Sequence, residues 1–224
     1  MKMNPTIFLS ICSMFYCVLL LVKQITLKEE KTAKTSILKC MTVVNLLTLL
    51  CEISGIFLGI NYEKYPILNS VVLRAMLIFY CLWLTFFVMY IINISLNEKK
   101  IKFKDNWYMF ILMMIASVLL IVLQINYVTK NGVVMYSTGM AVNVLLYYSM
   151  GCKVLALLIM FKNVKKTKIK NYSSLFVLIA LSALSVSIQS QNPSMLLSAS
   201  MDTFVTFYIY LNNHTKAKEV KKND

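Results

Sequence analysis

Seven long, unbroken apolar segments constrain the fold more than any other feature of this sequence. They cover residues 6–22, 37–60, 67–96, 107–128, 133–161, 172–189 and 194–211. A helix needs about 20 apolar residues to cross a bilayer, whereas the strands of a membrane barrel would alternate over about ten. The pattern predicts an all-α, polytopic membrane protein. Residues 1–212 would form a bundle of seven transmembrane helices.

The composition agrees with this prediction. The chain has 224 residues, of which 59% are hydrophobic and only 14% are charged, compared with about 45–50% apolar residues in soluble domains. Seven spans would use about 140 residues. The remainder suffices for short connections and a basic tail at residues 213–224, so we expect no soluble domain.

The distribution of lysines predicts an orientation in the membrane. Seventeen lysines lie in four segments, namely 23–37, 97–106, 162–171 and the tail, whereas the opposite side carries Lys2, Lys64 and Lys130. Lysine-rich connections stay in the cytoplasm. We therefore expect a multi-pass protein of the cell membrane with its N-terminus outside and its C-terminus cytoplasmic. The net charge of +14 is explained by this bias, and the predicted partner is the lipid bilayer rather than nucleic acid.

Four charged residues lie well inside the predicted spans, away from their ends: Glu52, Arg74, Lys153 and Asp202. Such residues usually face the interior of a bundle and find partners there. At about 1.5 Å per residue, Glu52 lies about 12 Å and Arg74 about 8 Å below the outer ends of adjacent spans. We therefore predict a Glu52–Arg74 ion pair. For Lys153, whose stem is long, we predict that the ammonium reaches the cytoplasmic interface.

Polar residues recur along three spans at helical spacing, which indicates buried polar faces. The stripes are Ser194, Ser198, Asp202, Thr206 and Tyr210; Asn45, Thr48, Glu52, Gly55 and Gly59; and Ser182, Ser185 and Gln189. We expect Asp202 to face an interior shared with the second, third and sixth spans. The signal or ligand candidates are Glu52, Arg74, Asp202, Gln189 and Asn45, whereas Ser198 and Thr206 belong to a structural polar stripe. For the charged candidates, a role in fixing helix register and a role in sensing a signal both stay open.

No catalytic motif stands out. The chain has one histidine, His214, and five glycines, so histidine-based metal sites, catalytic triads and glycine-rich phosphate loops are not expected. The six cysteines are scattered through the apolar segments without a CxxC spacing, which favours small packing residues over metal ligands or disulfides. We expect no enzyme activity in this chain and no cofactor.

Four segments carry a resemblance to a known family: "LIFYCLWLTFFVMYIINISLNEKK", "QINYVTKNGVVMY", "SIQSQNPS" and "YIYLNN". Over roughly residues 36–215, the chain resembles the seven-helix membrane sensor regions that precede GGDEF diguanylate cyclase or histidine kinase domains in low-GC Gram-positive bacteria. The second segment corresponds to a small outer hairpin between the fourth and fifth spans. The fourth ends the last helix, which continues into a charged tail.

The resemblance implies a signal-input module. It would relay a stimulus, received at the outer mouth or within the membrane, through the last helix to a cytoplasmic cyclase or kinase output module. In that family an output domain follows, whereas this sequence ends at Asp224. The chain is then either an input module separated from its output domain or a protein that works through a partner. A second copy of the chain, in a homodimer, is a further candidate partner. The alternatives are a small transporter or channel that uses Glu52, Arg74 and Asp202, and an enzyme acting on lipids, which lacks supporting motifs.

Overall fold

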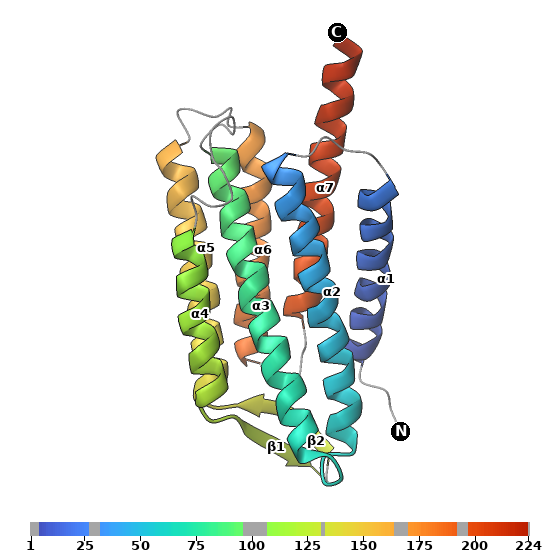
Figure 1. The fold of residues 1–224 in the computed structure, drawn as a ribbon, viewed down its shortest axis with the longest axis vertical. Helices are drawn as coiled ribbons and strands as arrows, with labels where there is room; N and C mark the ends of the chain where they lie inside the picture. Colours follow the sequence, from blue (N-terminus) through green and yellow to red (C-terminus); the bar gives the residue numbers. More distant parts are fainter. Residues whose placement is uncertain are drawn as a thin grey trace.

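The helices of the chain lie side by side along a common axis and form a bundle, with a short β-hairpin at one end (Figure 1). The computed structural model describes residues 5–26, 32–95, 107–130, 133–163, 170–191 and 197–223. Within these ranges the elements are α1 (Pro5–Thr26), α2 (Ala33–Ile60), α3 (Pro66–Ser95), α4 (Trp107–Val122), β1 (Asn126–Lys130), β2 (Val133–Thr138), α5 (Met140–Asn163), α6 (Lys170–Gln191) and α7 (Ser198–Asn223). The predicted helical fold is confirmed.

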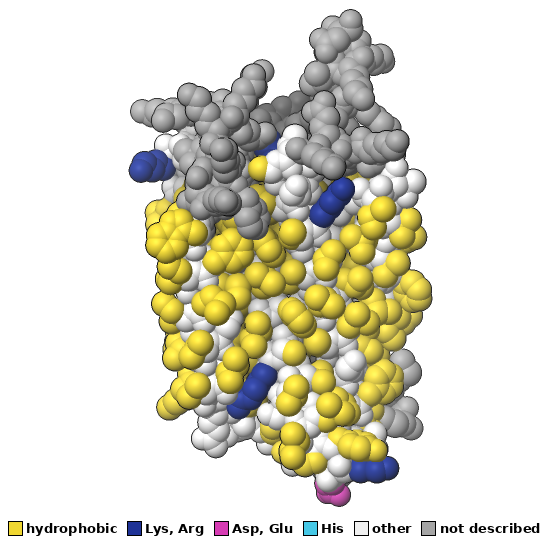
Figure 2. Space-filling view, in the orientation of Figure 1, with side chains coloured by type: hydrophobic (Ala, Val, Ile, Leu, Met, Phe, Trp, Pro, Cys, Tyr) yellow, Lys and Arg dark blue, Asp and Glu magenta, His cyan; other side chains and the backbone are white. Residues whose placement is uncertain are grey.

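Four of these helices are long and apolar enough to cross a membrane: α1, α2, α3 and α5. The helix α4 and the apolar stretch Ile179–Ile188 of α6 are shorter. Hydrophobic side chains cover the middle of the face seen in Figure 2, and most of its charged side chains lie near the two ends. The chain is therefore a helical membrane protein. The seven spans that the sequence predicts remain a prediction.

The helix α3 occupies the centre of the bundle and packs against α2, α4 and α5. Its second half is buried on every side, as expected of a helix that is apolar all round. The Trp83 ring stacks on Phe87 with 5.4 Å between the ring centroids. Its indole Nε1 donates a hydrogen bond of 3.2 Å to Thr206 Oγ1 of α7. These contacts fix the central helix against the last one.

Two predicted helix boundaries are wrong, because a β-hairpin lies between α4 and α5. The segments 107–128 and 133–161 were expected to be helical throughout, but α4 ends at Val122 and α5 begins at Met140. In between, β1 and β2 pair antiparallel, with Asn126 opposite Thr138. The reason lies in the local sequence, because β-branched and aromatic residues flank an Asn-Gly dipeptide, which is a strong hairpin signal. The small hairpin expected between the fourth and fifth spans is confirmed.

Gly139 allows the chain to pass from β2 into α5. Its φ is +114°, and an added Cβ would lie 2.7 Å from the backbone oxygen of Gln124. We expect Gly139→Ala to lower the free energy of unfolding by at least about 1 kcal/mol, measured as a lower thermal midpoint in detergent. Gly151→Ala is the matched control, since nothing lies within 4 Å of that position in α5. It should be neutral or stabilising, and equal losses for the two variants would contradict the strain argument.

Candidate ligand pocket and buried polar centre

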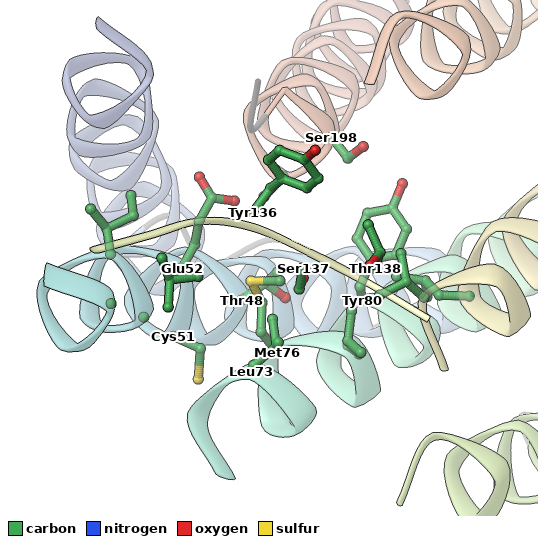
Figure 3. A pocket seen from close by; sticks show the side chains of 18 of the residues that line it. Thr48, Cys51, Glu52, Leu73, Met76, Tyr80, Tyr136, Ser137, Thr138 and Ser198 are labelled. Carbon is green, nitrogen blue, oxygen red and sulfur yellow. The ribbon is translucent and has the colours of Figure 1, made fainter. Parts of the chain in front are cut away.

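A pocket of about 350 Å³ lies at the hairpin end of the bundle. Its walls come mainly from α2, α3, α5 and β2, with Tyr127 from β1 and Val186 from α6. The start of α7 contributes Ser198 and Ala199 (Figure 3). The volume falls within the range of small-molecule sites in proteins, about 300–1,000 Å³. Apolar side chains alternate in the lining with hydroxyl groups such as those of Thr48 and Tyr80. The site is thus suited to a ligand that has both apolar and polar parts.

Glu52 is the charged residue among the described residues that line this pocket. Its side chain is only 5% exposed, and Ser10 of α1 donates a hydrogen bond to its Oε1. One and two helical turns further along α2, Gly55 and Gly59 also line the pocket. A Cβ on Gly59 would lie 3.4 Å from Val134 of β2, so the small residue allows the hairpin to approach α2.

The predicted ion pair between Glu52 and Arg74 is wrong. Arg74 Nη1 instead donates hydrogen bonds to backbone oxygens at the end of α4, at 2.6 Å from Ile121 O and 3.1 Å from Leu123 O, with a third to Leu120 O. The last carbonyls of a helix lack partners within it, and they attract a cation. Because α4 ends early, Arg74 caps α4, whereas Glu52 points toward α1.

Asp202 lies in the interior of the bundle, as predicted. It is 1% exposed, and neither of its carboxylate oxygens has a hydrogen-bond partner among the described residues. Its charge interacts with those of Lys153 and Glu52. The helix α7 packs against α1, α2 and α6, and Thr206 reaches Trp83 of α3. The prediction that Asp202 faces an interior shared with α2, α3 and α6 is confirmed. The helices α1 and α5 also contribute to this interior.

Lys153 does not reach the interface, contrary to the prediction. The residue is 3% exposed, and its Nζ donates a hydrogen bond of 3.0 Å to the backbone oxygen of Ser182 on α6. The charge of Asp202 lies close enough to interact with it. A buried ammonium needs an opposite charge and acceptors, and this interior provides both.

A second polar contact joins α1, α2 and α7 toward the other end of the bundle. Asn45 Nδ2 lies 2.7 Å from Thr203 Oγ1 and 3.3 Å from Cys17 Sγ. Asn45 therefore ties three helices together, and it does not line the pocket. Gln189 lies on α6, but its side chain is outside the described part of the structure.

The sequence prediction missed several residues that the fold brings to the site. Tyr80 of α3 lies beside Ser149 of α5 and Ser198 of α7, and it interacts electrostatically with Asp202. Tyr136 of β2 lines the pocket. The hydroxyl groups were visible as polar residues in apolar segments, but nothing in their spacing relates α3, α5 and the hairpin to one another. Ser198, predicted as part of a structural polar stripe, also lines the pocket.

The geometry therefore combines a ligand-sized pocket with a buried polar centre directly beneath it. Tyr80 and Ser198 belong to the wall of the pocket and lie near Asp202. A comparison with protein-family models gives no match, and a search of curated proteins finds no similar sequence. The function is consequently argued from the residues of this chain.

Proposed function

We propose that this chain is a membrane receptor that binds a small ligand in the pocket and transmits binding through α7. The proposal rests mainly on the position of α7. Its first turn supplies Ser198 and Ala199 to the pocket wall, and the same helix continues to Asn223, beyond the rest of the bundle in Figure 1. At 1.5 Å per residue, its 26 residues span about 39 Å.

The contacts along α7 give a route for the change. A ligand beside Ser198 would alter the packing of the first turn, and the next turn carries Asp202, whose charge interacts with Lys153 of α5. One turn later, Thr206 is bonded to Trp83 of α3. A ligand changes a conformational equilibrium only through different contacts in the two states. These polar contacts are the ones that a sliding or rotation of α7 would exchange.

The proposal includes the seven-span arrangement and its orientation. The lysine-rich segments support an orientation in which the hairpin end lies outside and the end of α7 lies in the cytoplasm. The helix α4 has 16 residues, about 24 Å, and is shorter than the ~30 Å bilayer core. The Arg74 guanidinium satisfies carbonyls at the end of α4 that would otherwise lack a partner within the helix. A cyclase or kinase output module, or a separate partner, would receive the signal at the end of α7.

The test is to fill the pocket covalently and measure the output. The full chain, freed of its native cysteines, is fused after Asp224 to a diguanylate cyclase domain, and Ser137→Cys places one thiol in the pocket wall. Alkylation with a maleimide should change the cyclase rate several-fold. Glu63→Cys is the matched control, because it lies in the exposed turn at the same end, and its alkylation should leave the rate unchanged. An unchanged rate after complete alkylation of Ser137→Cys would refute the receptor proposal.

A transporter is the second candidate, and a specific observation favours it. Glu52, Asp202 and Lys153 are three buried charges in one interior, and such groups often mark ion or solute pathways. The chain with alkylated Ser137→Cys, prepared without the cyclase, distinguishes a transporter from a receptor. If alkylation of Ser137→Cys blocks solute uptake into proteoliposomes and leaves the cyclase rate unchanged, the transporter is supported.

A further inference from the structure

We infer that the pocket binds a small organic cation, an amine or ammonium with an apolar group, whose positive charge lies at Glu52. This ligand class rests on the proposed receptor function, because it assigns the ligand of the same pocket. It is nevertheless tested by binding alone, without any output.

The first argument is the balance of buried charges. Among the described residues, the interior of the bundle holds the acids Glu52 and Asp202 and the base Lys153. The Lys153 charge interacts with Asp202, and Arg74 is bonded to the end of α4. Glu52 is therefore left without a described cationic partner.

The second argument is the cost of this arrangement. A carboxylate that is withdrawn from water is strongly destabilised unless an opposite charge or several donors compensate it. In the described ranges, the Ser10 hydroxyl is the group that donates a hydrogen bond to Glu52. A ligand ammonium in the pocket would supply the opposite charge and further N–H donors. An anionic ligand would instead meet the uncompensated charge of Glu52 at close range.

The third argument is the chemistry of the remaining lining. Tyr80, Tyr127 and Tyr136 contribute aromatic rings, whose faces attract cations within about 6 Å. Figure 3 shows Glu52 and Tyr136 extending to the same side of α2. Leu73 and Met76 of α3 provide an apolar wall. The pocket therefore matches a cation with an apolar body, and the described residues that line it include no Lys, Arg or His.

The experiment compares two compounds that differ in charge and little in shape, 2-phenylethylamine and 2-phenylethanol. The full chain carrying Ser137→Cys as its single cysteine is held in nanodiscs, and the rate of alkylation by a small neutral maleimide is measured. We expect the amine to slow alkylation with saturation and the alcohol to have little effect. Adding Glu52→Gln should raise the amine concentration for half-protection by about ten- to hundredfold, as expected for the loss of a charge-assisted hydrogen bond.

Glu63→Gln is the matched control, because it removes a carboxylate from the same end of the molecule but outside the pocket lining. It should leave the half-protecting concentration unchanged. Protection that is equal for amine and alcohol, absent for the amine, or unaffected by Glu52→Gln would overturn the cation assignment. If the cyclase rate of the fused chain still responds to alkylation of Ser137→Cys, the receptor proposal survives that result, so the two failures are distinguishable.

Discussion

Replacing Lys153 with methionine should lower the free energy of unfolding by about 3–5 kcal/mol, the usual cost of breaking a buried charge pair from one side. The substitution keeps the apolar stem but removes the ammonium, which donates to the backbone oxygen of Ser182 and whose charge interacts with that of Asp202. Asp202 would then lie in the interior near Glu52 without a nearby cation, and its carboxylate oxygens have no hydrogen-bond partner among the described residues. The measurement is denaturant unfolding of the purified chain in detergent micelles.

The double variant Lys153→Met with Asp202→Asn distinguishes a charge pair from two separate packing effects. Because it removes both charges, it should be more stable than Lys153→Met alone, and the two single losses should not add. Lys162→Met is the matched control at the exposed end of α5 and should change stability by less than about 0.5 kcal/mol. Strictly additive losses at Lys153 and Asp202 would show that the two charges are not coupled.

Replacing Arg74 with glutamine should destabilise the end of α4 and lower the free energy of unfolding by about 1.5–3 kcal/mol, the usual value of hydrogen bonds to a charged group. Three backbone carbonyls would lose their guanidinium donor. Hydrogen exchange should therefore become faster locally, in the last turn of α4 and in β1. Peptide-resolved exchange followed by mass spectrometry, together with the thermal midpoint, measures both effects.

Two further variants make the Arg74 result specific. Arg74→Lys keeps the positive charge near the negative end of the α4 dipole and should lose less stability than Arg74→Gln. Glu52→Gln should leave exchange in this segment unchanged, because Glu52 is bonded to Ser10 of α1. If Glu52→Gln accelerated exchange there as much as Arg74→Gln, the two residues would be coupled after all.

The membrane helices are determined largely by local sequence. Long apolar runs make the helices, and the lysines and prolines between them mark their limits, so the starts of α3 and α4 agree with prediction to within a residue. The buried stripe of α7 was also readable, because residues four apart share one face of a helix. The predicted outer hairpin followed from the resemblance of residues 124–136 to a known family. The extent of its strands did not, because apolar strands and helices look alike over short runs.

Only the tertiary structure decided which partner each buried charge has. Depth along a helix gave Glu52 and Arg74 the same level, but depth carries no information about the direction in which a side chain points around the helix axis. The packing of α3 between α2 and α4 directs Arg74 to the end of α4, and the packing of α1 on α2 gives Ser10 to Glu52. The sequence alone thus determined which residues are polar inside the bundle. The rotation and neighbours of each helix depend on packing between distant segments. They determined that Glu52 lines a pocket and that Lys153 bonds to α6 within range of the Asp202 charge.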